Sequence, residues 1–237
     1  MISKKISPPN CDTCDNKDSI ILCSMNKSEL AEFSKTKSFN VYKKGQIIFY
    51  EGNQPHGLFC IKSGKVKVHK MGGEGDDQIV RFVKPGGLLG YRALLSNEPY
   101  KASATALENT LICYIPKNDF IEQIKKNGQL SMLTIQMLTN DLKAAEKRIL
   151  NMAQKPVRER IAEALLLIKE CYGLENDEQT IAAILTRREI GDVAGVTTET
   201  TIRTLSEFKA EKIIKLDGKK IKILNMSRLV KLANIID

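Results

Sequence analysis

Three cysteines near the N-terminus have a spacing that suits metal or cluster chemistry. Cys11, Cys14 and Cys23 form a C-x2-C-x8-C pattern within the mostly polar segment NCDTCDNKDSIILC. Two intervening residues make a tight turn, so the C-x2-C thiolates can converge on one metal ion or cluster. Three ligands leave one position of a tetrahedral zinc site or of a four-iron cluster unfilled. The candidate fourth ligands are Cys60, Cys113, Cys171, His56 and His69.

These cysteines are expected to meet a reducing environment. The N-terminus, MISKKISPPN, lacks a hydrophobic signal segment, and no apolar run approaches the roughly 18 residues of a membrane span. We therefore expect a soluble, cytoplasmic protein. In that compartment, spaced cysteines more often bind metal or perform redox chemistry than form structural disulfides. An iron–sulfur cluster, a zinc site, a disulfide switch and inert thiols all stay open for the N-terminal trio.

A second set of residues suits the reading of nucleic acid. Glu199 and Arg203 are four positions apart, so a helix places them on one face. Arginine can donate two hydrogen bonds to guanine O6 and N7, and glutamate can accept one from cytosine N4. The alternative is a solvated salt bridge worth only about 0.3–0.5 kcal/mol. Hydroxyls for phosphates, or methyls for thymine, come from Thr197, Thr198, Thr200 and Thr201.

The elements around this pair favour the nucleic-acid interpretation. Thr186 and Glu189 form a capping box for a helix that ends at Gly195, and Thr197 caps the next helix. Two helices joined by a short glycine-containing turn form a helix-turn-helix, whose second helix fits the major groove. A basic hairpin with an Asp217-Gly218 turn then predicts a wing. The candidate DNA contacts are Thr197, Thr198, Glu199, Thr200, Arg203, Arg187, Lys219 and Lys220.

A long helix is predicted over residues 129–154, and Pro156 ends it. Its apolar residues alternate at spacings of three and four, as in a helix that packs against another helix. The stripe is narrow and uncharged, which suits a second copy of the chain better than a broad core. An ordinary amphipathic helix lying on its own domain is the alternative. The predicted seam is Ile135, Leu138, Leu142, Ala145, Ile149 and Met152.

Residues 40–115 have a different texture, with short alternating runs broken by glycines. Such a pattern is typical of an antiparallel β-roll or jelly-roll sandwich. Ser63-Gly64 is interpreted as a hairpin turn, and short helices are expected from Ser28 and over Asp119–Lys126. The predicted strands are Gln46–Tyr50, Leu58–Lys62, Lys65–Lys70, Gln78–Val83, Ala102–Ala106 and Thr110–Ile115.

The chain is therefore predicted to be an α+β protein of 237 residues with a cysteine-bearing segment and three further parts. Its net charge of +9 favours a polyanionic partner. However, residues 155–237 hold 15 basic and 13 acidic side chains, so the basic excess does not mark the DNA-reading part. The expected parts are a cysteine-bearing segment (1–27), a β-roll sensor domain (28–126), a dimerisation helix (127–155) and a winged helix-turn-helix domain (156–237).

The order of these parts resembles the CRP/FNR family of bacterial transcription regulators over essentially the whole chain. The matching stretches are Gly45-Gln46 with Ile48-Phe49, Ser63-Gly64 with Val66-Lys67, GDDQI from Gly75, PGGLLG from Pro85 and IGDVAGVTTETTIR from Ile190. The resemblance implies a cyclic-nucleotide-binding-like sensor domain and base contacts from Glu199 and Arg203. Ile202 stands where the FNR branch has serine, so the outer bases of the DNA site are not fixed by the resemblance.

Family members that bind cyclic AMP use a Gly-Glu pair and an Arg-Ser/Thr pair. The corresponding positions here are Gly90-Tyr91 and Lys101-Ala102. The first change removes the carboxylate that accepts from ribose, and the second removes the bidentate phosphate clamp. Cyclic AMP binding is therefore not expected.

The FNR branch of the family senses oxygen through a [4Fe–4S] cluster held by three N-terminal cysteines and one cysteine of the roll. The segment ENTLICYIP resembles the sequence around that fourth ligand. The resemblance thus implies a cluster on Cys11, Cys14, Cys23 and Cys113, although the gap before Cys23 is longer than usual for the branch. A longer loop costs little closure entropy. Alternatively, Cys113 is a small hydrophobe in a buried strand.

The expected function is that of a homodimeric, sequence-specific transcription regulator that responds to oxygen or redox state. The expected partners are a two-fold symmetric double-stranded DNA site and RNA polymerase, with no membrane. The alternative keeps DNA binding but senses haem, nitric oxide, a small ligand or thiol oxidation, with zinc-bound or inert cysteines. An enzyme is not expected, because no catalytic motif is recognisable. The uncharged seam around Ala145 further predicts a dimer even without the cofactor.

Overall fold

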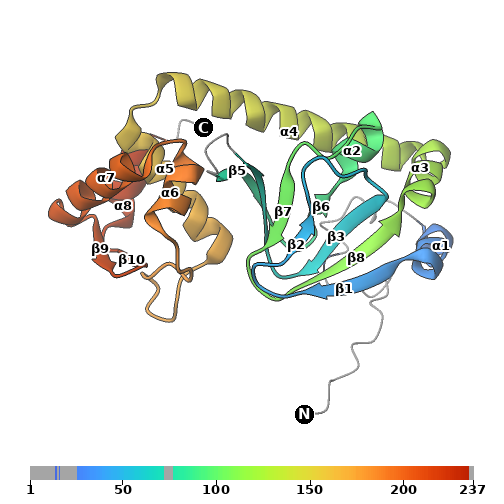
Figure 1. The fold of residues 1–237 in the computed structure, drawn as a ribbon, viewed down its shortest axis with the longest axis horizontal. Coiled ribbons are helices and arrows are strands. Elements are labelled where there is room, and N and C mark those ends of the chain that lie inside the picture. The colour runs from blue at the N-terminus through green and yellow to red at the C-terminus, as the bar shows by residue number, and fades with distance from the viewer. Residues whose placement is uncertain (1–13, 15, 17–25, 72–76, 235–237) are drawn as a thin grey trace, which may run out of the picture. The chain divides into compact units, whose positions relative to one another are not determined.

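The computed structural model describes residues 14, 16, 26–71 and 77–234, which divide into two compact units. Of the described residues, the first unit comprises 14, 16, 26–70 and 81–141, and the second comprises 71, 77–80 and 142–234. Figure 1 labels the elements. The helices are α1 (Lys27–Thr36), α2 (Tyr91–Ser96), α3 (Lys117–Lys126), α4 (Gly128–Gln154), α5 (Val157–Tyr172), α6 (Arg187–Ala194), α7 (Thr198–Ala210) and α8 (Met226–Ala233).

Two four-stranded sheets lie mostly in the first unit, and only β5 has residues, 77–80, that are assigned to the second. Their strand orders are β1-β8-β3-β6 and β2-β7-β4-β5, with antiparallel pairing of β8 to β1 and β3, and of β7 to β2 and β4. The strands are β1 (Ser38–Tyr42), β2 (Ile47–Phe49), β3 (Gly57–Ser63), β4 (Val66–Met71), β5 (Asp77–Val83), β6 (Leu88–Leu89), β7 (Ser103–Ala106) and β8 (Thr110–Pro116). This confirms the antiparallel sheet domain predicted from sequence.

The turn at Ser63-Gly64 does not make the predicted hairpin. β3 and β4 belong to different sheets, so the chain crosses between the two layers here. Gly64 has φ of 90°, and a Cβ atom on it would lie 2.4 Å from the Thr110 hydroxyl. Glycine is needed for this close approach to β8. The Ser63-Gly64 signal therefore predicted a turn correctly, but the strands on either side of it, β3 and β4, do not pair with each other.

One apolar cluster connects the sheet β1-β8-β3-β6 to the helices of the first unit. We call it the sensor core. Alternate residues of β3 and β8, together with Leu88 of β6, supply it from the sheet, and α2, α3 and the first turn of α4 supply it from the helices. Its buried members are Leu58, Cys60, Leu88, Tyr91, Leu94, Cys113, Ile115, Phe120 and Leu130.

The second unit holds a helix-turn-helix and a wing, as predicted. The wing strands are β9 (Ile214–Asp217) and β10 (Lys220–Ile223), paired antiparallel. Asp217 pairs with Lys220, so the two-residue turn is Gly218-Lys219, one position later than predicted. Before α6, an isolated bridge pairs Thr180 with Lys222 of β10, and the amide of Ile181 donates to the carbonyl of Ile221 at 3.0 Å. Among the described residues, no helix is both long and apolar enough to span a membrane.

One carboxylate, that of Asp177, holds the loop that leads into this bridge. Asp177 accepts hydrogen bonds from the amides of Gln179 (3.1 Å) and Thr180 (2.7 Å) and from the Thr180 hydroxyl (2.7 Å). Lys222 on β10 adds a contact at 3.1 Å. The hydrogen bonds from Thr180 and Gln179, followed by that from Lys222, hold the pKa of Asp177 well below its ordinary value of 3.8.

Asp177→Asn is expected to destabilise the second unit at neutral pH but not in strong acid. The folded-state pKa is lower than the unfolded one, so the ionised carboxylate stabilises the fold above pH 4. That contribution is lost as the pH falls through the folded-state value. Urea unfolding of both proteins from pH 7 to pH 2 checks this, because the difference between them should shrink as the pH falls below 4. An unchanged difference between them across that range would contradict it.

Candidate DNA interface and cysteine site

The position of α7 is set by close packing between α6 and the turn that connects the two helices. A Cβ atom on Gly191 would lie 2.7 Å from the Val196 carbonyl oxygen, so α6 tolerates only glycine where α7 begins. Gly195 closes α6 with φ of 65°, and its carbonyl accepts from the Arg160 guanidinium at 3.0 Å. The Val196 amide donates to the Gly191 carbonyl. The turn geometry is thus set by small residues and by an arginine from α5.

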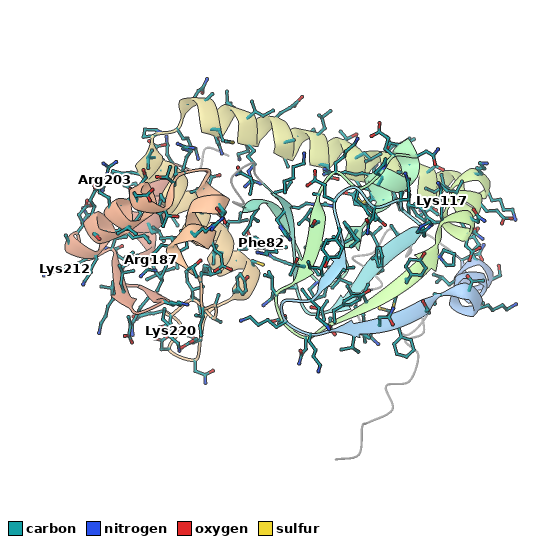
Figure 2. The ribbon with its side chains drawn as sticks, viewed as in Figure 1. Phe82, Lys117, Arg187, Arg203, Lys212 and Lys220 are labelled. Atoms are coloured by element: carbon teal, nitrogen blue, oxygen red, sulfur yellow. The ribbon has the colours of Figure 1, made fainter. Side chains whose placement is uncertain are left out.

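The outer face of α7 carries the two predicted base-reading residues. Glu199 and Arg203 are both exposed, and no salt bridge of the described residues involves either side chain. The helix-surface salt bridge considered as the alternative is therefore not formed. Figure 2 labels Arg203 on this helix. Both charged groups are free to meet base edges, which carry the complementary donors and acceptors.

The threonines at the start of α7 have divided roles. Thr197 caps the helix, because its hydroxyl accepts from the Thr200 amide at 3.3 Å and contacts the Thr200 hydroxyl at 3.1 Å. Thr198 is half-buried, and Thr197 is exposed. Thr201 is fully buried and donates to the Thr197 carbonyl at 2.9 Å. The interpretation of Thr201 as a contact to DNA is therefore wrong, because its side chain packs inside the domain.

The inner face and the far end of α7 fix the helix to the rest of the unit. Phe208 is fully buried, and the Arg158 guanidinium lies 5.2 Å from the centre of its ring. Arg158 also contacts Glu207 at 2.6 Å and Glu211 at 2.5 Å. These two carboxylates, Glu211 foremost, raise the pKa of Arg158. The reading helix is therefore held from behind, which leaves its outer face unobstructed.

The wing lysines differ in whether an acidic side chain of the same unit already pairs with them. Lys219 lies exposed in the two-residue turn at the tip. Lys220 instead contacts Glu175 at 2.8 Å, and this carboxylate raises the pKa of Lys220. Lys222 is similarly paired with Asp177. Of the two predicted wing contacts, Lys219 is thus placed for phosphate, whereas Lys220 would have to leave an acidic partner.

Arg187, predicted to contact DNA, is directed into the domain. Its guanidinium donates to the Gly218 carbonyl at 2.9 Å, and burial lowers its pKa. The contact connects the first turn of α6 to the wing turn. Figure 2 labels Arg187 and Lys220 in this unit. Arg187 therefore braces the wing against the helix-turn-helix, a role that sequence reasoning did not anticipate.

The predicted seam of α4 is mostly solvent-exposed within one chain. The exposed fractions are 55% for Ile135, 59% for Leu142 and 69% for Ile149, three residues at intervals of seven. Ala145 and Met152 are exposed as well. Leu138, however, is half-buried and packs against the sensor core. Most of the stripe is thus apolar surface that its own chain does not cover.

The structure brings two of the four predicted cluster ligands to the same place. Cys113 on β8 is a buried member of the sensor core, and Cys14 packs against that core. The Asn16 amide group donates to the Lys62 carbonyl at 2.5 Å, which ties this segment to the end of β3. Cys11 and Cys23 lie outside the described residues. Within the described residues, no group of three metal-ligating side chains is assembled.

Tyr91, at the position that the resemblance aligns with a ribose-binding glutamate, is fully buried in the first unit. Its hydroxyl donates to Asp141 on α4 and accepts from Arg81 at 3.0 Å, and Arg92 contacts Asp141 at 2.8 Å. Burial, together with Asp141, raises the pKa of Tyr91, although Arg81 opposes this. The network ties α2 to α4 within the first unit. Sequence reasoning missed it, because no local pattern pairs residues 50 positions apart.

On the rest of the outer face of α7, the sequence analysis considered Ile202 but not Ser206. Ile202 is 49% exposed and Ser206 is exposed, and both share a face with Glu199 and Arg203. Helical periodicity was the signal that could have found Ser206. Ile202 offers an apolar surface, of the kind that contacts a thymine methyl group.

Comparison with known proteins identifies the family. The model of the cyclic nucleotide-binding domain matches residues 39–127, and the model of the Crp-like helix-turn-helix domain matches residues 159–232. Together the two cover more than half of the chain.

The relatives are regulators of one type. The chain is 28% identical to the fumarate and nitrate reduction regulatory protein of Vibrio cholerae, over 95% of the chain and 91% of that protein. FixK2 from Bradyrhizobium japonicum is similar in structure, with a TM-score of 0.71, 25% identity and coverage of 85% and 100%. A CRP/FNR family regulator from Eubacterium rectale has the same fold, with a TM-score of 0.78 at 20% identity and coverage of 91% and 99%. The chain therefore belongs to the CRP/FNR family of DNA-binding transcription regulators.

Proposed function

We propose that this regulator acts as a homodimer on two-fold symmetric DNA and responds to oxygen or redox state through a [4Fe–4S] cluster. The ligands would be Cys11, Cys14, Cys23 and Cys113. The observation that carries the proposal is that Cys14 packs against the apolar core to which Cys113 belongs. Two ligands that are 99 positions apart in sequence therefore meet in one small region.

The donor chemistry fits such a cluster. Thiolates are the usual ligands of [4Fe–4S] centres, and four of them complete the set. When bound, the cluster supplies oxygen-sensitive chemistry, and the chain holds it through its cysteines. The V. cholerae relative is named for fumarate and nitrate reduction, which agrees with a regulator of this kind. Tyr91 and Lys101 make a cyclic nucleotide an unsuitable effector, because neither supplies the carboxylate or guanidinium clamp.

The position of the cysteine site provides a route to α4. Met137 and Leu138 of that helix pack against the same core as Cys14 and Cys113. A change in the ligation of Cys113 would therefore alter the packing under α4. Since well-packed interiors transmit small displacements, α4 would shift in response. In a dimer built on α4, such a shift would change the spacing of the two reading helices.

The exposed stripe of α4 supports self-association. Three large aliphatic side chains, Ile135, Leu142 and Ile149, are more than half exposed and recur every seven residues. This is the repeat of a coiled-coil seam, and pairing with a second copy would remove the stripe from water. The seam contains no charge that would oppose pairing of the cofactor-free chains.

The base-reading role of Arg203 can be tested directly. Arg203→Ala is expected to weaken specific binding by about 1–3 kcal/mol, roughly 5- to 150-fold, and to relax the base preference at one position per half-site. Lys219→Ala should instead weaken binding to all sequences and reduce the salt slope by about one. Fluorescence anisotropy at several salt concentrations separates these effects. Lys209→Ala, on the exposed far end of α7, is the matched control. Equal losses for Arg203→Ala and Lys209→Ala would contradict the assignment.

The dimer seam can be tested with one charge. Ile149→Glu should give monomers at micromolar concentration, because pairing would bury two carboxylates side by side. The side chain is 69% exposed within one chain, so the substitution spares the protomer's own core. Analytical ultracentrifugation of cofactor-free protein is the measurement, with Lys143→Glu as control. Dimers are expected for the wild type and the control. A monomeric cofactor-free wild type would refute the cofactor-independent seam.

The cluster can be tested by its composition. Anaerobically purified protein should contain about four iron and four sulfide per chain, with broad visible absorbance that bleaches in air. Cys113→Ser should lose most of the iron, whereas Cys171→Ser, a change in α5 of the other unit, should keep it. Colourless wild-type protein containing zinc, or no metal, would overturn the cluster and leave DNA binding intact.

A further inference from the structure

Cys113 has a second cysteine directly opposite it in the sheet. The register of β3 and β8 pairs Cys60 with Cys113, two positions from the pair Leu58 and Ile115. Side chains alternate between the faces of a strand, and opposite residues of an antiparallel pair point to the same face. All four residues belong to the sensor core. The two thiols therefore lie on the same side of the sheet.

The spacing of this pair suits a disulfide. Opposite residues of antiparallel strands have Cα atoms about 4.5 or 5.5 Å apart, depending on whether the pair is hydrogen-bonded. Disulfides form over Cα separations of roughly 4.4–6.8 Å. The Cα separation of either type of pair falls within this range. No disulfide joins the described cysteines in this structure, so the bond would be a change of state.

We propose that Cys60 is the redox partner of Cys113, and that a Cys60–Cys113 disulfide withdraws Cys113 from cofactor binding. The oxidant is hydrogen peroxide, because both residues are at least 91% buried and only a small uncharged oxidant suits them. The consequence for the cofactor rests on the proposed function, since it requires Cys113 to be a ligand. The bond itself does not depend on that role.

The chemistry balances with peroxide as the only co-reactant. The Cys113 thiolate attacks one peroxide oxygen, the O–O bond breaks, and sulfenic acid and water form. The Cys60 sulfur then attacks the Cys113 sulfur, which releases a second water as the S–S bond forms. Two thiols lose two electrons and two protons in total, and one peroxide is reduced to two waters. A dithiol reductant reverses the step by thiol–disulfide exchange.

Such a bond would change what the cell can rebuild after the cofactor is lost. With Cys113 held in a disulfide, one of the four proposed ligands cannot bind iron, because only the thiolate is a ligand. Reassembly would then require reduction as well as a supply of iron and sulfide. The pair would thus distinguish brief exposure to oxygen from sustained oxidation.

The sequence allows the bond to be mapped directly. Trypsin releases Cys60 in the peptide of residues 45–62 and Cys113 in that of residues 102–117, each with no other cysteine. Reduced, metal-free, full-length protein is treated with hydrogen peroxide, alkylated and digested without reductant. The expected product is the two peptides joined, lighter than their sum by two hydrogens. Cys113 joined to an N-terminal cysteine, or both peptides recovered alkylated, would overturn the proposal.

A variant identifies the partner. Cys60→Ala retains all four proposed cluster ligands but should give no joined peptide, and its Cys113 sulfenic acid should be trapped by dimedone. Cys171→Ala should behave as the wild type. Wild-type protein exposed to peroxide should take up iron and sulfide only after dithiothreitol. If the wild type never binds iron, the proposed cofactor fails, whereas the peptide map still decides the disulfide. If Cys60→Ala unfolds by circular dichroism, the wild-type map alone decides.

Discussion

The pairing of β3 with β8 is the constraint on which the sensor unit depends. It aligns Leu58 with Ile115 and Cys60 with Cys113, so that one face of the sheet supplies a row of apolar groups. Helices α2, α3 and α4 cover that face through the sensor core. Because this core is close-packed, any bond formed at Cys113 changes the surface against which α4 rests. The Cys113 side chain therefore contributes to core packing and also carries a thiol that can react.

In the DNA-binding unit, the charged side chains expected to contact DNA are exposed on the outer face of α7, whereas the contacts that fix the helix are made by its opposite face. Phe208 and the ion pairs of Arg158 hold α7 from within, and Gly191 permits its close approach to α6. Each exposed ion pair contributes little free energy, but several acting on one helix restrict its orientation. The outer side chains Glu199 and Arg203 therefore need no contacts within the chain. These two side chains stay exposed to solvent because α7 is held in place by its inner face.

Local signals in the sequence were sufficient for the helices and for the order of the domains. The capping box at Thr186 and the cap at Thr197 both form, because each requires only residues three positions apart. What local patterns could not supply was pairing at long range. The turn at Gly64 connects two sheets rather than two paired strands. The hydrogen bond of Tyr91 to Asp141 likewise depends on α4 crossing α2, which no window of sequence contains.

The same limit explains why cysteine spacing alone left the N-terminal trio undecided. A C-x2-C pair indicates that two thiolates can converge, but the kind of metal or cluster depends on the other ligands brought near them by the fold. The structure adds two long-range relations, the packing of Cys14 against the core that contains Cys113 and the position of Cys60 opposite Cys113 in the sheet. A cysteine that looks like an ordinary small hydrophobe in sequence thus acquires a chemical neighbour only through strand pairing. Its position on the strand opposite Cys113 makes redox chemistry available that the same residue on a helix would lack.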